Sequence, residues 1–254
     1  MNNFQHIETI PNLHLERFDI YNNDAYKQIE YFIQSDLKVD HIITDPPYNI
    51  SQDNNFGTMR NPRQGVDFGQ WDRGTFNLFA WIPLYSRLLT PNGSMIIFCS
   101  YRYLSNIIHV LEHEAEMDVK DIIVWQKKNP MPRNTTRRYV QDMEFAIWAV
   151  KKNCKWIFNK PNDVPYLRAL YTTGLVAGKE RLGHPTQKSL QLMKDLISVH
   201  TNKDQLILDP FMGSGSTGEA SLMLGRRFVG VEMSPEYYEM SKKRLMKYED
   251  LGLF

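Results

Sequence analysis

The chain contains little cysteine, no long apolar run and almost no net charge, and each shortage excludes a class of protein. Cys99 and Cys154 are its only cysteines, too few for a disulfide framework or a cysteine-rich metal cluster. No apolar run approaches the roughly 18 residues of a membrane span. Residues 1–6 have neither the basic nor the apolar region of a secretory signal. We therefore expect a cytoplasmic globular protein without a metal site.

The net charge of +1 conceals one basic segment. Residues 127–160 carry nine lysines or arginines against two acidic residues. Aromatic residues lie in or beside this segment: Trp125, Tyr139, Trp148, Trp156 and Phe158. Basic side chains can meet phosphates and aromatic rings can stack on bases, so the mixture favours a nucleic-acid partner. A solvated surface is the alternative explanation.

Apolar residues alternate between short strands and amphipathic helices in this 254-residue chain, which is long enough to bury a substantial core. Strands are predicted at residues 38–44, 94–100, 120–125, 144–150, 205–208 and 227–231. Helices are predicted at residues 24–34, 76–89, 189–200 and 217–224, and from Ser234 onward. This alternation favours a largely parallel sheet with helices on both faces. Residues 51–74, 129–138 and 159–183 lack such patterning, and loops of this length are usually functional.

A glycine-rich turn follows the predicted strand at residues 205–208. It runs from Asp209 through Phe211, Gly213 and Gly215 into a helix, and Glu232 ends the next strand 19 residues after Gly213. The glycines allow a tight bend close to a ligand, and the distal acid can accept hydrogen bonds from ribose hydroxyls. The arrangement predicts a nucleoside-binding unit, for a dinucleotide or for S-adenosylmethionine. A turn whose glycines serve packing alone is the alternative.

A second motif, Asp45-Pro46-Pro47-Tyr48, follows the predicted strand at residues 38–44. The prolines fix φ and lack N–H groups, so the corner is stiff and its carbonyls can accept hydrogen bonds from a ligand. The amino nitrogen of adenine is a poor nucleophile because its lone pair is conjugated with the ring. The Asp45 carboxylate and the Pro46 carbonyl can bind its two hydrogens and expose that lone pair, while the Tyr48 ring stacks on the base. A rigid turn capped by Asp45 is the alternative, and the nucleoside-binding unit argues against it.

These motifs, with the Asp-Pro-Pro-Tyr corner first and the glycine-rich turn last, resemble those of the circularly permuted β group of DNA amino-methyltransferases from restriction–modification systems. The segment from His184 to Lys188 and the tripeptide Asn23-Asp24-Ala25 resemble two further parts of that family. The resemblance runs from about residue 20 to residue 247. It implies one catalytic domain over residues 1–254 with a Rossmann-like α/β fold, a largely parallel seven-stranded sheet, and DNA-recognition insertions at about residues 51–74 and 129–183.

The resemblance also implies a role for each matching residue. Catalysis would fall to Asp45, Pro46, Pro47 and Tyr48. The implied cofactor, S-adenosylmethionine, would contact Asp24, Ala25, Asp45, His184, Thr186, Gln187, Lys188, Asp209, Phe211, Gly213, Gly215 and Glu232. Because arginine reads guanine edges and asparagine reads adenine, DNA would contact Arg133, Asn134, Arg137 and Arg138. A helix cap is the alternative role for His184, and an exposed helix position is the alternative for Lys188.

The implied activity is site-specific methylation of the N6 amino group of adenine in duplex DNA by direct displacement on a flipped-out base. The chain has no Pro-Cys pair, and cytosine C5 methylation needs a nucleophilic cysteine. Cytosine N4 methylation is the nearest alternative, and Asp rather than Ser before Pro46 favours adenine. An NAD-dependent dehydrogenase or a noncatalytic nucleic-acid-binding protein would leave one of the two motifs unexplained, while RNA stays open as a substrate. A second copy of the chain, a companion methylase and a cognate restriction endonuclease are candidate partners.

Overall fold

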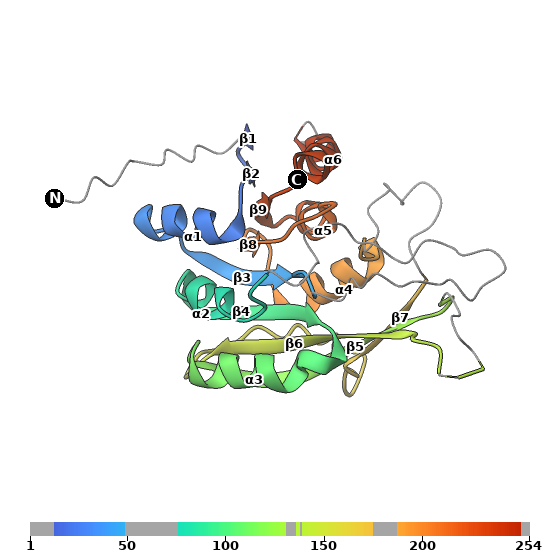
Figure 1. Ribbon diagram of the computed structural model, residues 1–254. Coiled ribbons are helices and arrows are strands. Elements are labelled where there is room, and N and C mark those ends of the chain that lie inside the picture. The colour runs from blue at the N-terminus through green and yellow to red at the C-terminus, as the bar shows by residue number, and fades with distance from the viewer. Residues whose placement is uncertain (1–12, 49–75, 131–135, 138, 175–186, 250–254) are drawn as a thin grey trace.

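The computed structural model describes residues 13–48, 76–130, 136–137, 139–174 and 187–249 (Figure 1). The strands are β1 (Leu13–His14), β2 (Phe18–Asn22), β3 (Val39–Thr44), β4 (Leu89–Cys99), β5 (Met117–Lys127), β6 (Met143–Lys151), β7 (Leu170–Thr173), β8 (Leu206–Asp209) and β9 (Arg227–Glu232). The helices are α1 (Ala25–Gln34), α2 (Trp81–Ser86), α3 (Leu104–His113), α4 (Leu190–His200), α5 (Ser216–Met223) and α6 (Pro235–Leu245). Short 3-10 turns, η2 (Tyr101–Tyr103) and η4 (Met246–Tyr248), complete the described elements.

All nine described strands join one sheet in the order β1-β2-β9-β8-β3-β4-β6-β5-β7. Neighbours from β2 to β4 run parallel, and β6 lies antiparallel between β4 and β5. The predicted α/β class with a mostly parallel sheet is confirmed. The described strands exceed the predicted seven because β1 and β7 add two short strands, one at each edge.

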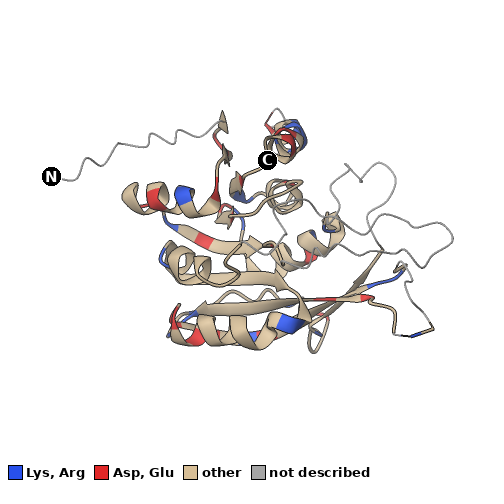
Figure 2. Cartoon of the chain, viewed as in Figure 1, with Lys and Arg blue, Asp and Glu red and all other residues tan. Residues whose placement is uncertain are grey.

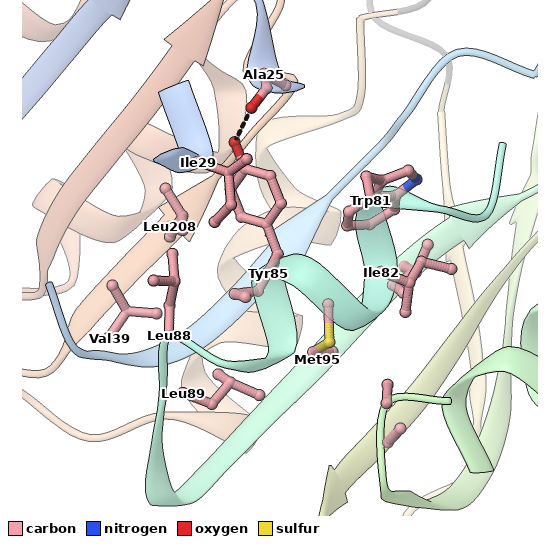
Figure 3. Packing of buried hydrophobic residues seen from close by; sticks show 14 of the residues in the cluster. Ala25, Ile29, Val39, Trp81, Ile82, Tyr85, Leu88, Leu89, Met95 and Leu208 are labelled. Atoms are coloured by element: carbon pink, nitrogen blue, oxygen red, sulfur yellow. Dashed lines mark hydrogen bonds between the residues drawn. The ribbon is translucent and has the colours of Figure 1, made fainter. Parts of the chain in front are cut away.

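Helices cover both faces of the sheet, and consecutive strand residues alternate between two cores. Ile42 and Ile97 belong to the core beneath α1, α2 and α3, whereas Ile43 and Ile96 belong to the core beneath α4, α5 and α6. The first core is drawn in Figure 3, where the Tyr85 hydroxyl donates to the Ala25 carbonyl oxygen at 2.8 Å. Strand β4 has no charged residue, and Figure 2 shows how few charges lie along the middle of the sheet. A sheet buried on both faces explains the continuous apolar runs in the sequence.

Side-chain caps set the beginnings of two helices beside the sheet edge. Asp24 accepts hydrogen bonds from the N–H groups of Tyr26 and Lys27, at 2.8 and 3.2 Å, and so begins α1. Ser234 caps α6, with Pro235 at the first helical position, as the sequence predicts.

Three elements differ from the sequence prediction. Helix α2 covers only Trp81–Ser86, because Leu89 already pairs with Val39 and begins β4. The Thr90–Gly93 turn signal therefore forms an irregularity within β4 rather than a helix-to-strand loop. Helix α3 and strand β2 were not predicted at all. Within the described residues, the helices are too short or too polar for a membrane-spanning segment.

Candidate functional site

Four acidic residues lie at the carboxyl ends of four neighbouring parallel strands. Asp24 follows β2, Glu232 ends β9, Asp209 ends β8, and Asp45 follows β3. Since parallel strands end at the same edge, the two sequence motifs, more than 160 residues apart, meet there. The carboxyl edge of a parallel sheet is the usual ligand-binding side of an α/β fold.

A hydrogen bond joins the Asp-Pro-Pro-Tyr corner to the glycine-rich turn. Thr44, the residue before Asp45, donates its hydroxyl to Asp209 Oδ1 at 2.6 Å, and the same oxygen accepts the Phe211 N–H at 3.1 Å. Burial raises the pKa of Asp209 to about 6, although these donors oppose the rise. Asp209 therefore fixes the relative position of the two motifs.

Glu232 closes the glycine-rich turn from the other side. Gly213 donates its N–H to Glu232 Oε2 at 2.9 Å, and Ser234 donates its N–H to Oε1 at 2.7 Å. Burial raises the pKa of Glu232 to about 7. Gly213 and Gly215 have φ values of 49° and 74°, a region that favours glycine. Gly215 also serves packing, because a Cβ there would lie 2.9 Å from Ser241 Cβ on α6.

Asp24 and Ala25 lie directly beside Glu232. The side chain of Asn22 donates to the Glu232 carbonyl oxygen at 2.8 Å, and the Asn23 N–H reaches the same oxygen at 3.2 Å. Asp24 acts as the cap of α1, and buried Ala25 is held from behind by the Tyr85 hydroxyl. The structure thus brings this tripeptide to the edge where the sequence placed the cofactor's nucleoside.

The Asp45 carboxylate is held by two donors. Tyr48 donates its hydroxyl to Oδ1 and Lys188 donates its ammonium to Oδ2. Burial raises the pKa of Asp45, while the charge of Lys188 opposes that rise. Pro46 is buried and Pro47 is half-buried, as expected for a stiff corner. Lys188 is thus no exposed helix residue, which excludes its alternative role.

Sequence reasoning missed Glu144, a further acidic residue in this site. Its Oε2 lies 3.1 Å from Lys188 Nζ, and its Oε1 lies 2.5 Å from Lys127 Nζ. Glu144 is the second residue of β6, which runs antiparallel to β4 and so begins beside the carboxyl end of β4, where Cys99 pairs with Phe145. Burial disfavours the Glu144 carboxylate, but the charges of Lys188 and Lys127 outweigh burial and lower its pKa. An acid at the start of a buried strand was the available signal.

Fewer side chains of the basic segment are available to a nucleic acid than its sequence indicates. Trp125 and Trp148 are buried in the core, so their rings cannot stack on bases. Lys127 is engaged by Glu144. The exposed residues of the segment include Arg137, Tyr139, Trp156 and Phe158.

Part of the predicted recognition segment is built into the fold. The Asn159 side chain donates to carbonyl oxygens at the end of α4, those of Ser198 at 3.1 Å and Thr201 at 2.9 Å. Strand β7 pairs with β5 at the sheet edge. The remaining predicted site residues lie outside the described residues: His184, Thr186, Arg133, Asn134, Arg138 and all of residues 51–74.

The hydrogen-bonding side chains at this edge of the sheet fit a nucleoside cofactor. Asp209 and Glu232 form no ion pair with another described residue, and both carboxylates are held by hydrogen-bond donors. Ribose hydroxyls are such donors. Buried Gln187 and Lys188 lie at the opposite end of the same edge, next to Asp45. No cluster of histidine, cysteine and acidic side chains suited to a metal ion exists in the described ranges.

Comparisons with known proteins agree on one family. A family described as DNA methylase, the N6/N4 methyltransferases, matches residues 39–243. The Type II methyltransferase M2.MboI of Moraxella bovis is 34% identical over 249 residues, which cover 90% of this chain and 88% of that protein. The Type II methyltransferase M2.DpnII of Streptococcus pneumoniae is 32% identical, covering 93% of this chain and 92% of that protein.

Solved structures show the same architecture. The M1.HpyAVI–SAM complex is 50% identical with a TM-score of 0.74, covering 90% of this chain and 98% of that chain. The cytosine-N4-specific PvuII DNA methyltransferase is only 17% identical with a TM-score of 0.71, covering 96% of this chain and 94% of that chain, and it supports the fold alone.

Proposed function

This chain belongs to the DNA methylase family, and we propose that it transfers a methyl group from S-adenosylmethionine to the N6 amino group of adenine in duplex DNA. The observation that carries the proposal is the Thr44–Asp209 hydrogen bond of 2.6 Å, which sets the Asp45 corner against the glycine-rich turn. Such an arrangement suits transfer between a bound nucleoside cofactor and an amino group. The comparisons, not this hydrogen bond, confirm the family predicted from the sequence and its methyl donor.

The corner supplies what an amino nucleophile needs. When S-adenosylmethionine is bound, it supplies an activated methyl group on its sulfonium. Asp45 and the Pro46 carbonyl accept the hydrogens of the target amino group, and Tyr48 holds the ring of the flipped-out base. Each carboxylate oxygen of Asp45 accepts a hydrogen bond from one side chain, Tyr48 at Oδ1 and Lys188 at Oδ2, which leaves further lone-pair positions for the base.

The state of the cysteines supports direct displacement. Burial, and then the nearby charge of Asp45, raise the pKa of Cys99 to about 12, so its thiol is not ionised at neutral pH. Burial also raises the pKa of Cys154. Neither group suits the nucleophile that cytosine C5 methylation needs.

The cofactor residues follow the sheet edge in this proposal. Glu232 binds the ribose, Asp24 and Ala25 meet the adenine, and Phe211 with Gly213 forms the floor beside them. His184, Thr186, Gln187 and Lys188 line the methionine side, where Asp45 also reaches. Gly215 secures the turn against α6.

DNA recognition in this proposal belongs to residues outside the sheet. Insertions at about residues 51–74 and 129–183 of a single catalytic domain would meet the target, through Arg133, Asn134, Arg137 and Arg138. A homodimer, a companion methylase and a cognate restriction endonuclease belong to the same proposal, as does action in the cytoplasm.

Tritiated S-adenosylmethionine and duplex DNA of mixed sequence test the function, followed by digestion to nucleosides. We expect N6-methyladenine as the labelled product, and loss of at least about 100-fold in rate for Asp45→Asn, the scale of a lost catalytic acceptor. Asp36→Asn is the matched control, because Asp36 is an exposed residue in the turn between α1 and β3. N4-methylcytosine as the only product would overturn the adenine assignment. A fully active Asp45→Asn variant would overturn the role of the corner.

A further inference from the structure

Four side chains of alternating charge form a row that ends at the catalytic corner. In order they are Lys127, Glu144, Lys188 and Asp45, with contacts of 2.5 Å from Lys127 to Glu144 and 3.1 Å from Glu144 to Lys188. Lys188 also binds Asp45 directly. Lys127 ends β5, Glu144 lies at the start of β6, Lys188 precedes the α4 cap, and Asp45 directly follows β3, so the fold assembles the row from four separate segments.

Exposure along the row is uneven. The Lys188 side chain is only 6% exposed, whereas Asp45 and Glu144 are 22% and 23% exposed. The ammonium is therefore the most buried member of the row, and the Glu144 Oε2 atom that faces it is buried as well, so Asp45 is the member that can still meet a ligand. The Lys188 ammonium lies 5.2 Å from the Phe98 ring centre and 5.9 Å from the Tyr48 ring centre, so aromatic faces enclose it as well.

Sharing one buried ammonium between two carboxylates has a chemical consequence. An ammonium that faced Asp45 alone would weaken that carboxylate as a hydrogen-bond acceptor and compete with an incoming amino group for Oδ2. Glu144 draws the same ammonium away from Asp45, and Lys127 balances the charge of Glu144 on its outer side. The two lysines and the two carboxylates of the row have no net charge together, so no charge of the row is buried without a partner of opposite sign.

We propose that Glu144 is a positioning residue for methyl transfer, which shares Lys188 with Asp45 and so keeps the Asp45 carboxylate available to the target amino group. This inference rests on the proposed function for its catalytic meaning. Glu144 touches neither reacting atom in this role, and acts through Lys188.

The first test is a titration of the ligand-free protein. Lys188, Tyr48, Glu144, Cys99 and Asp209 are the titratable groups that act on Asp45 from the surrounding elements. Glu144→Gln removes a negative charge from this set, so we expect the pKa of Asp45 to fall. Carbon-13 NMR of labelled side-chain carboxyls measures it, with the resonance assigned by its loss in Asp45→Asn.

Matched variants separate charge from structure. Glu144→Asp keeps the charge, so the Asp45 titration should stay close to that of the unchanged protein. Lys127→Met removes a positive charge at the far end of the row, so the pKa of Asp45 should rise. The rise should be smaller than the fall in Glu144→Gln, because Lys127 lies farther from Asp45. This variant tests the row even if Glu144→Gln does not fold. Exposed Glu114→Gln, at the end of α3, should leave the titration in place.

Kinetics give the second test. We expect Glu144→Gln to lower kcat at least about tenfold, within the range of couplings in one ion-pair network. Its dissociation constant for S-adenosylmethionine, measured by calorimetry, should change less than kcat does, since the nucleoside side is untouched and only the Lys188 contact on the methionine side is altered. Glu144→Asp should recover most of the kcat. The acidic limb of the kcat–pH profile should move to lower pH in Glu144→Gln.

An unmoved Asp45 titration in Glu144→Gln, or a kcat within twofold of the unchanged protein, overturns the positioning role. If the unchanged protein methylates no DNA while the titration shifts as expected, the proposed function fails and the charge sharing stands.

Discussion

Protonation of Glu232 should control cofactor affinity near neutral pH. Its two oxygens already accept the Gly213 and Ser234 N–H groups. A proton on this carboxyl would occupy an acceptor position that a ribose hydroxyl needs. Because burial raises the pKa of Glu232 to about 7, this competition falls near neutral pH.

The size of the effect follows from that pKa. At pH 6, roughly a tenth of Glu232 is ionised, so the apparent affinity for S-adenosylmethionine should be about tenfold weaker than well above pH 7. Binding should also release close to one proton per cofactor at pH 6 and almost none at pH 8. Folding stability changes in the opposite sense. The unfolded carboxyl titrates near 4.5, so the contribution of Glu232 is fully present below that pH and is lost as pH rises through about 7.

Calorimetry in buffers of different ionisation enthalpy, from pH 6 to pH 8, measures both affinity and proton release. Glu232→Gln should bind more weakly, with an affinity that no longer changes between pH 7 and pH 8 and with no proton release at pH 7. Asp209, whose pKa is raised by burial to about 6, adds its own titration at lower pH, and Asp209→Asn identifies that part. An affinity in the unchanged protein that is flat from pH 6 to pH 8 would refute the reasoning, as would an equal slope in Glu232→Gln.

Thr44→Val removes a buried donor to Asp209 and should lower the free energy of unfolding by about 1–3 kcal/mol, as measured by urea denaturation; an unchanged midpoint would show that the bond contributes nothing. Arg137→Glu, at an exposed position, should weaken DNA binding and reduce the slope of log affinity against log salt by about 1 in a fluorescence-anisotropy titration, leaving cofactor affinity unchanged. If DNA affinity and its salt slope stay the same, Arg137 does not face DNA. Arg244→Met leaves Glu219 without its buried partner, the two side chains being 2% and 12% exposed, and should cost roughly 3–5 kcal/mol by urea denaturation. A loss below about 1 kcal/mol would mean that water reaches this pair.

Local patterns in the sequence predicted the centre of the fold well. The run before Asp45 became β3 and the run before Asp209 became β8, because strands buried on both faces need continuous apolar residues. Helix α3 carried a readable signal in Ile107, Val110 and Leu111, which lie three and four residues apart and are all buried. Strand β2 carried little signal, since its five residues are stabilised by a partner strand 210 residues away.

Site residues also divide into those with a local sequence signal and those placed by distant strand pairing. Asp45 and Glu232 were predictable, because Asp45 directly follows β3 and Glu232 ends β9, and both strands are recognisable from their own apolar residues. Glu144 carried only a weak signal, an acid at the start of a predicted strand, because its place in the site depends on the order β4-β6-β5, in which β6 returns antiparallel between two earlier strands. The residues around Glu144 in the sequence do not indicate this strand order. The ion pairs of Glu144 with Lys127 and Lys188 depend on that order.

The pairing of β2 with β9 also bears on how the protein is made. Strand β2 is translated about 200 residues before its neighbour in the sheet, β9. Until then the nascent chain presents an unpaired edge and lacks the acid that closes the glycine-rich turn. A transcript cut short before Arg227 would yield a polypeptide with the corner but without a finished nucleoside site.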